Sequence, residues 1–242
     1  MEVRNNTPNI SFNARVLSKA ITHVGKKEIV LYKLGAEDKG FLDNFVSQTN
    51  LKKIYPTKSS YDSFGEWNAI IKTSALKAGR DNMIMATCDK RPCGFLIFKQ
   101  KPHKKIQITK LITWGIKKDV TPPHVGKVLM HSIFSEAQKE KMSSIYLVPS
   151  SETSLGKHDN AFYEVLNFKA SDSITDERYT YDCSYLSKTK AQLENFFDIK
   201  DEKGINDINL KKELSLNYGD TFSEKILSFF KKLTSNNAKL SK

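Results

Sequence analysis

The alternation of apolar and polar residues starts at residues 27–34, which predict a first strand. Apolar residues then recur at helical spacing in residues 36–48 and 61–79, and two helices are expected there. Two β-compatible runs at residues 83–88 and 94–99 flank the turn-forming sequence Asp-Lys-Arg-Pro, which predicts a hairpin. The first half of the chain is therefore expected to hold one strand, two helices and a hairpin.

A second group of periodic segments follows the hairpin. Residues 105–117 alternate as a strand does, a helix is expected from about Gly126, and the apolar run at residues 144–150 predicts another strand. Strand, turn, helix and strand predict a βαβ unit, whose two strands are neighbours in one sheet. The turn then precedes a helix N-terminus, where unpaired backbone N–H groups can hold a phosphate. Residues 176–188 alternate again and predict a last strand.

The two ends of the chain differ in composition from this middle part. Residues 1–25 are polar with scattered apolar groups, and we expect a loosely ordered extension. Residues 189–242 are charged and helix-prone, so a helical, basic extension is expected beyond a domain at residues 26–188. An apolar stripe in residues 222–233 predicts an amphipathic helix that packs on its own domain, or binds a partner or a membrane surface.

Composition narrows the classes of partner. The chain has 39 Lys and Arg against 27 Asp and Glu, a net charge of +12, which favours phosphate-bearing or polyanionic partners, although a lysine-rich solvated surface explains the same balance. Three cysteines without paired metal-ligand spacing predict reduced thiols and no metal site. The sequence has no apolar run of about 20 residues and no signal-peptide core, so a soluble, cytoplasmic protein is expected.

Two segments of the middle part carry a resemblance. The sequence AFYEVLNF at residues 161–168, and the turn at residues 116–126 with the helix KVLMHSIFSEAQ after it, together resemble the GNAT (Gcn5-related N-acetyltransferase) family. The resemblance covers residues 27–188. It implies an α/β fold with a mixed, mostly antiparallel central sheet and helices on both faces. It also implies that acetyl-CoA binds at the turn through its pyrophosphate.

The turn departs from the family pattern Arg/Gln-x-x-Gly-x-Gly/Ala. Thr121 stands where the family has Arg or Gln, His124 replaces the first glycine, and only Gly126 is kept. Pro122 and Pro123 carry no N–H, so two potential phosphate donors are missing, and lysines beside the turn are candidates to replace them. The resemblance assigns these residues to the cofactor: Ile116, Lys117, Val120, Thr121, His124, Val125, Gly126, Lys127, Val128 and Tyr163.

Acetyl transfer to an amine needs a neutral amine, a stabilised oxyanion and a proton for the leaving thiolate. The resemblance assigns the proton to Tyr163, whose phenol is protonated at neutral pH, while a tyrosine that packs by its ring is the alternative. It implies a backbone N–H at residues 114–116 for the oxyanion. Glu152, His124 and His131 are the candidates for a general base, although His131 also fits an ordinary helix face.

The leading hypothesis is an acetyl-CoA-dependent N-acyltransferase acting on an amine, either a small molecule or a protein. A degenerate fold that binds without catalysis is the first alternative, because the turn has lost family residues and the predicted central strand at residues 105–117 contains no Asp, Glu or His. A basic, nucleic-acid-associated protein is the second, because of the net charge and the basic hairpin. The acceptor cannot be deduced from the sequence.

Overall fold

The computed structural model describes residues 14–35, 38, 41, 82–113, 122–149, 156–172, 176–201 and 208–214. Its strands are β1 (Arg15–Thr22), β2 (Glu28–Lys33), β3 (Asn82–Cys88), β4 (Arg91–Lys101), β5 (Lys105–Thr113), β6 (Ser144–Leu147), β7 (Lys169–Ala170), β8 (Tyr179–Asp182) and β9 (Phe197–Asp201). Its longer helices are α4 (Val125–Lys139), α5 (Gly156–Val165) and α6 (Leu186–Glu194). The short helices are η2 (Cys183–Tyr185) and α7 (Leu210–Glu213).

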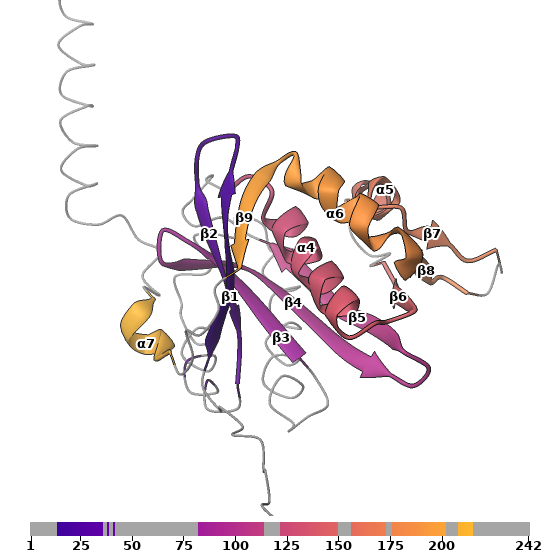
Figure 1. Cartoon of the computed structure of the whole chain (residues 1–242), viewed down its shortest axis with the longest axis horizontal. Helices are drawn as coiled ribbons and strands as arrows, with labels where there is room; N and C mark the ends of the chain where they lie inside the picture. Colours follow the sequence, from indigo (N-terminus) through magenta and orange to yellow (C-terminus); the bar gives the residue numbers. More distant parts are fainter. Residues whose placement is uncertain are drawn as a thin grey trace, which may run out of the picture.

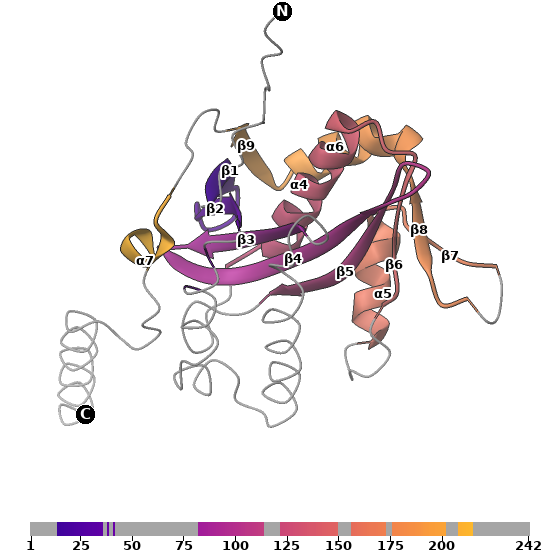
Figure 2. The same cartoon turned by 90° about the horizontal axis from the view of Figure 1, so that it is seen from below.

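The described strands form one sheet in the order β7-β8-β6-β5-β4-β3-β2-β1-β9 (Figure 1). Within the described residues β5 and β6 pair in parallel, and every other pair of strands is antiparallel. Helices α4 and α6 lie on one face of the sheet and α5 lies on the other (Figure 2). The expected mixed, mostly antiparallel sheet with helices on both faces is confirmed.

The predicted hairpin and βαβ unit are both present. Strands β3 and β4 are joined by Asp89 and Lys90, whose φ angles of 51° and 59° are left-handed, as a two-residue hairpin turn requires. The turn is shorter than the four residues expected, because Arg91 and Pro92 already pair with β3. Strand β5, helix α4 and strand β6 form the βαβ unit.

The core lies between the sheet and α4. The inward face of α4 is apolar and fully buried, since Val128, Leu129, Ile133 and Phe134 are all 0% exposed. The Phe134 ring packs 4.8 Å from the ring of Tyr181 in β8. Burying these side chains stabilises the fold by about 1.5–3 kcal/mol each. The apolar residues whose helical spacing predicted α4 are thus the ones that α4 buries against the sheet.

The prediction of a loosely ordered segment at residues 1–25 is wrong for residues 15–22. They form β1, an interior strand that pairs with β2 on one side and β9 on the other. The side of β1 that faces α4 carries Ser18, Ala20 and Thr22, whereas Val16, which precedes a β-bulge, pairs with Tyr32 and faces the other way; all four are buried. Two of these four side chains are polar, so the strand gives almost no hydrophobic alternation in the sequence.

The expected domain end at residue 188 is also wrong. Helix α6 spans that boundary and packs on α4, and β9 completes the sheet beside β1. Leu193 and Phe197 are buried at 2% and 0% exposure. Beyond them, α7 is a short helix within the stretch at residues 189–242 that was expected to be helix-prone. The stretch that looked like an extension therefore contributes to the core.

Several expectations fall outside the described residues. These are most of the two helices at residues 36–48 and 61–79, the amphipathic helix at residues 222–233, and residues 1–13. Among the described residues, no helix is both long enough and apolar enough to cross a membrane.

Gly94 in β4 lies directly against α4, and we expect Gly94→Ala to destabilise the fold. A Cβ at this position would be 2.9 Å from Val125 Cγ1, 3.0 Å from the Ile112 carbonyl oxygen and 3.0 Å from Leu129 Cδ1. The overpacking should lower the free energy of unfolding by about 1–3 kcal/mol, measured by urea denaturation. Gly126→Ala is the control, because its nearest contact is 3.4 Å and alanine favours a helix. Equal stability of Gly94→Ala and wild type would contradict this prediction.

Candidate active site

Strands β5 and β6 pair only where both begin. The parallel register joins Lys105 to Ser144, Ile106 to Ile145 and Gln107 to Tyr146. Strand β5 then continues for six residues to Thr113, and β6 ends at Leu147. On the β6 side, the last six residues of β5 have no strand partner among the described residues. Backbone N–H and C=O groups along an open strand edge can bind an extended, amide-containing ligand.

Helix α4 begins beside the end of β5. Its N-cap residue, His124, has a left-handed backbone with φ 63°, and no side chain caps this end of the helix. The first turn contains no acidic residue. Because the helix dipole places partial positive charge at the N-terminus, this end of α4 favours an anion.

Gly126 joins the two segments that carried the resemblance. A Cβ at Gly126 would lie 3.4 Å from Cζ of Phe162 in α5 and 3.9 Å from Cγ2 of Thr113 at the end of β5. The ring of Phe162 therefore packs over the first turn of α4. A bulky side chain at Gly126 would collide with this ring, so such a variant would disturb packing as well as any phosphate site.

Tyr163 follows Phe162 and is half-buried beside the core. Its ring packs edge-on against Phe162 at 5.3 Å and against Phe168 at 5.7 Å. The ring packing that was the alternative to a catalytic role is thus present. It does not exclude the role, because packing holds the ring in place and leaves the function of the hydroxyl as a prediction.

A cluster that the sequence did not predict covers the other side of the α4 N-terminus. Phe196, which follows α6, lies 5.0 Å from the ring of His124, and Lys127 Nζ lies 3.1 Å from the centre of the Phe196 ring. The position is fixed by His23, whose ring nitrogens contact the Asn195 carbonyl oxygen at 2.9 Å and Asp198 Oδ1 at 3.1 Å. Only the pairing of β1 with β9 brings these residues together.

Positive charge dominates this cluster. Burial lowers the pKa of His124, and the nearby Lys127 and His23 lower it further. Burial also lowers the pKa of Lys127. The lowered pKa keeps the His124 imidazole largely neutral at neutral pH, when it can accept a proton. An anion at this end of α4 would be attracted to Lys127 and would favour its charged form.

Comparison with known proteins adds a likeness of fold. No family model matches the sequence, and neither does any curated protein. Among solved structures, the PaiA N-acetyltransferase of Thermoplasma acidophilum in complex with coenzyme A is 19% identical, with 64% of this chain and 98% of that chain covered and a TM-score of 0.46. The spermidine N-acetyltransferase of Vibrio cholerae, in complex with CoA and spermine, is 15% identical, with 66% of this chain and 98% of that chain covered and a TM-score of 0.41. An uncharacterized protein of Bacillus halodurans is 10% identical, with 76% of this chain and 98% of that chain covered and a TM-score of 0.49.

These identities and scores carry no argument about cofactor or substrate. The element order, the parallel β5–β6 pair and the divergence of its strands are those that the resemblance implies. The fold is GNAT-like. Strands β1 and β9 belong to the same sheet, although their residues lie outside residues 27–188, which the resemblance covers.

The structure describes some of the residues assigned to the cofactor and not others. Val125 and Val128 are buried at 2% and 0% exposure, so their side chains serve the core and only their backbone can face a ligand. His124, Gly126 and Lys127 lie together at the start of α4. Outside the described residues lie Ile116, Lys117, Val120, Thr121 and the base candidate Glu152.

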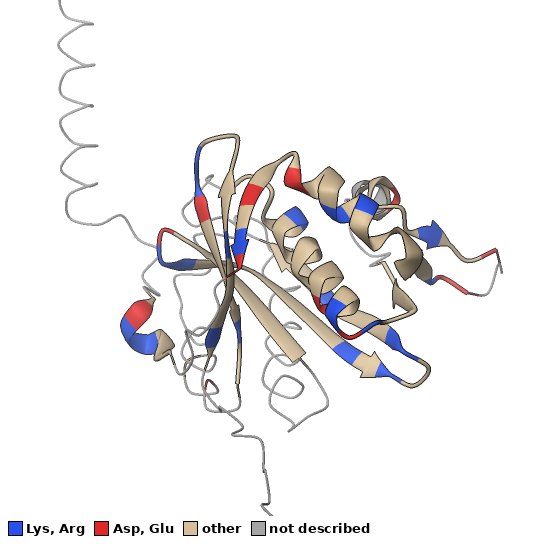
Figure 3. Ribbon diagram, viewed as in Figure 1, with Lys and Arg blue, Asp and Glu red and all other residues tan. Residues whose placement is uncertain are grey.

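The lysines of the β4–β5 hairpin are not at this site. Lys101, Lys104 and Lys105 lie at the tip of the hairpin, whereas the N-terminus of α4 follows the opposite end of β5 (Figure 3). A nine-residue strand separates the two ends by about 26–30 Å. The extended strand therefore holds the charges of the basic hairpin apart from the start of α4.

All three cysteines are free and protonated at neutral pH. Burial raises the pKa of Cys88 and that of Cys183 to about 11, and raises the pKa of Cys93 well above its usual value. A thiol is a weak nucleophile until it loses its proton. The described residues therefore offer no cysteine nucleophile to the GNAT-like site.

His131 has a structural position on α4. It is 3% exposed, its Nε2 lies 3.0 Å from Glu194 Oε1 in α6, and its ring packs edge-on against Phe197. Burial lowers the pKa of His131, although the contact with Glu194 opposes this shift. With Nε2 donating to the Glu194 carboxylate, the basic lone pair is on Nδ1, which is buried without a partner in the described structure, so His131 is not placed to act as a general base.

We expect acid to weaken the fold partly through His131. The pKa of His131 in the folded protein lies below the ordinary value of 6.5. As the pH is lowered below 6.5, the unfolded chain therefore binds more protons than the folded protein does, and the free energy of unfolding decreases. One such histidine gives a slope of at most about 1.4 kcal/mol per pH unit. Urea denaturation between pH 5 and 7 should show a smaller slope for His131→Gln than for wild type. The exposed His103 provides the control His103→Asn, and equal slopes in all three proteins would contradict the prediction.

Proposed function

We propose that this chain is an acetyl-CoA-dependent N-acyltransferase that transfers an acetyl group to an amine. The observation that carries the proposal is the divergence of β5 from β6 beside the uncapped N-terminus of α4. The open edge of β5 suits an extended ligand with amide groups, and the N-terminus of α4 suits a phosphate at one end of that ligand. Acetyl-CoA combines these two chemical features. The cytoplasm is our prediction for where it acts, in keeping with three protonated thiols.

The residues at the start of α4 fit a diphosphate by charge. Lys127 and the backbone of His124 and Gly126 would hold it, with no acidic side chain in the first turn to repel it. When bound, acetyl-CoA supplies an activated acetyl thioester. Phe196 keeps the Lys127 ammonium close to this end of the helix, and the exchange of that contact for a phosphate is a local movement of one side chain.

We assign the remaining roles to Tyr163, which the resemblance indicates, and to the base candidates His124 and Glu152 from the sequence. Tyr163 donates a proton to the leaving sulfur, and the packing of its ring between Phe162 and Phe168 supports this assignment because it fixes the phenol. His124 is the favoured base, since its lowered pKa leaves it neutral at pH 7. Glu152 is the alternative base.

Release of free CoA thiol with a panel of small amines and a lysine peptide tests the enzyme. For Tyr163→Phe we expect at least about a tenfold fall in kcat, with acetyl-CoA affinity by titration calorimetry unchanged, because one general acid contributes about 10²–10⁴-fold. Tyr179→Phe is the control, because this tyrosine bonds to Glu164 at 3.3 Å and has no assigned role. Equal kcat in Tyr163→Phe and wild type would exclude the tyrosine acid.

A non-catalytic binding protein is the second candidate, favoured by the contact between Lys127 and Phe196. The lysine that would meet a phosphate already has a partner, and two prolines precede it where N–H donors are expected. Weak or absent acetyl-CoA binding at millimolar concentration, without thiol release for any amine, would support this candidate and overturn the enzyme. Thiol release with any amine would overturn the non-catalytic candidate.

A further inference from the structure

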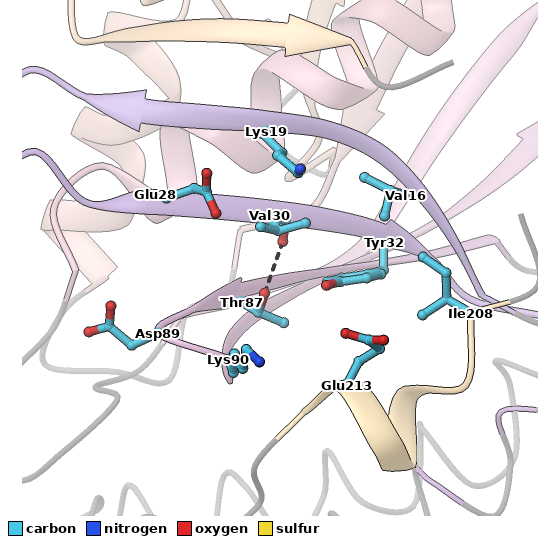
Figure 4. A pocket seen from close by; sticks show the side chains of 10 residues that line it. All are labelled: Val16, Lys19, Glu28, Val30, Tyr32, Thr87, Asp89, Lys90, Ile208 and Glu213. Atoms are coloured by element: carbon cyan, nitrogen blue, oxygen red, sulfur yellow. Dashed lines mark hydrogen bonds between the residues drawn. The ribbon is translucent and has the colours of Figure 1, made fainter. Parts of the chain in front are cut away.

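A pocket of about 420 Å³ opens on the other face of the sheet (Figure 4). Lys19, Val30 and Thr87 lie side by side on β1, β2 and β3 and line it. Their neighbours in sequence, such as Ala20 and Ile29, belong to the core that packs on α4. Successive side chains of a strand point to opposite faces, so the pocket faces away from α4.

The pocket combines an apolar surface with a buried phenol. Val16, Val30 and Ile208 supply apolar area, and Ile208 is held by a bridge to Ala14 beside β1. Tyr32 is only 8% exposed, and its hydroxyl turns into the same space as the Glu213 carboxylate of α7 (Figure 4). A concave apolar surface with a few converging polar groups is the usual form of a small-molecule site.

Two exposed carboxylates, Glu28 and Glu213, act on the buried Tyr32 phenol of this pocket. Burial raises the pKa of Tyr32, and the charges of Glu213 and Glu28 raise it further. A hydrogen bond from Thr87 lowers this pKa and offsets part of the rise. Within the described part of the chain, neither Glu28 nor Glu213 forms an ion pair. The third carboxylate, Asp89, differs because it pairs with Lys27 at 3.0 Å.

Two lysines, Lys19 and Lys90, also line the pocket. Among the charged groups that act on the Tyr32 hydroxyl Glu213 has the largest effect, so the negative end is the end beside Glu213. It stands in contrast to a chain of net charge +12. A cation in this end would pair with the Glu213 carboxylate and would gain a hydrogen bond acceptor in the phenol oxygen.

We propose that this pocket binds a small organic amine in its cationic form. The ammonium group pairs with Glu213 beside the Tyr32 hydroxyl, and the apolar body of the ligand packs on Val16, Val30 and Ile208. The site lies on the face away from α4 and is separate from the acetyl-CoA site proposed above. It holds whether or not the chain transfers an acetyl group.

Matched ligands of different charge test the proposal on the full chain. Protein with labelled Val and Ile methyl groups is titrated with 2-phenylethylamine, 2-phenylethanol and phenylacetate, and with butylamine and butanol. We expect at least one amine to shift the methyl resonances of Val16, Val30 and Ile208 in a saturable way. Its neutral and anionic counterparts should bind at least about tenfold more weakly, because charged hydrogen bonds are the stronger ones. Equal binding of amine and alcohol, preference for phenylacetate, or no shift with any amine would overturn the proposal.

Substitutions locate the ammonium group. Glu213→Gln should weaken amine binding by about tenfold, while Glu28→Gln, on the other side of the pocket, and Glu177→Gln, at an exposed residue of the loop before β8, should not. The methyl spectrum of each variant reports whether it is folded. If Glu213→Gln unfolds, Tyr32→Phe replaces it in the test, because this substitution removes the hydroxyl and keeps the ring. Unchanged amine affinity in Glu213→Gln would refute the assignment. Acetyl-CoA titration of the same samples reports the other site, so failure of one proposal is distinguishable from failure of the other.

Discussion

Truncation after Lys188 should abolish the fold, although the sequence pattern put the end of the domain there. The shortened chain loses most of α6 and all of β9, with the buried Leu193 and Phe197. Removing a large buried side chain costs about 2–5 kcal/mol, and β1 also loses its five residue pairs with β9. A domain of this size is stable by only about 5–15 kcal/mol. We expect circular dichroism to show no cooperative thermal transition.

Truncation after Leu214 is the matched control. It keeps every described strand and helix, including α7, so a cooperative transition like that of the full chain is expected. If the chain ending at Lys188 melts with the same midpoint as the control, β9 is dispensable and the placement of β1 as an interior strand has no energetic consequence.

Lys127→Gln should weaken acetyl-CoA binding by about ten- to hundredfold. A hydrogen bond to a charged group contributes about 1.5–3 kcal/mol, and each 1.4 kcal/mol is a factor of ten in affinity. Burial lowers the pKa of Lys127, so wild-type affinity should begin to fall at a lower pH than for an ordinary lysine. Titration calorimetry between pH 7 and 10 measures both effects.

Lys139→Gln is the control for the loss of one positive charge. Lys139 is in the last turn of the same helix and its side chain is 68% exposed. A general effect of net charge would weaken binding equally in both variants. That result would remove Lys127 from the site, and wild-type affinity in Lys127→Gln would do the same.

The candidate site shows how far local pattern reaches. Gly126 and Tyr163 were identified from two short segments, and the structure brings those segments into contact through Phe162. Phe196 gave no signal, because an aromatic residue in a charged, helix-prone stretch has many possible partners. It lies on Lys127 only because β9 returns to β1.

The sequence by itself determined the elements whose side chains follow a clear period. The hairpin of β3 and β4, the helix α4 and the parallel strands on either side of it are formed by apolar residues at spacings of two or three to four. These elements gave the mixed sheet and the βαβ unit. Their periodicity is local, so it can be recognised without knowledge of the rest of the chain.

Only the tertiary structure decided the edge of the sheet and what surrounds the two sites. Strands β1 and β9 pair across almost the whole chain, and His23 meets Asp198 at a separation of 175 residues. The buried side of β1 includes Ser18 and Thr22, and the Thr22 hydroxyl is satisfied there by hydrogen bonds with the backbone of Val24 and Lys27. Pairing of this kind depends on which surfaces remain open after the local elements have formed, and no local period records it.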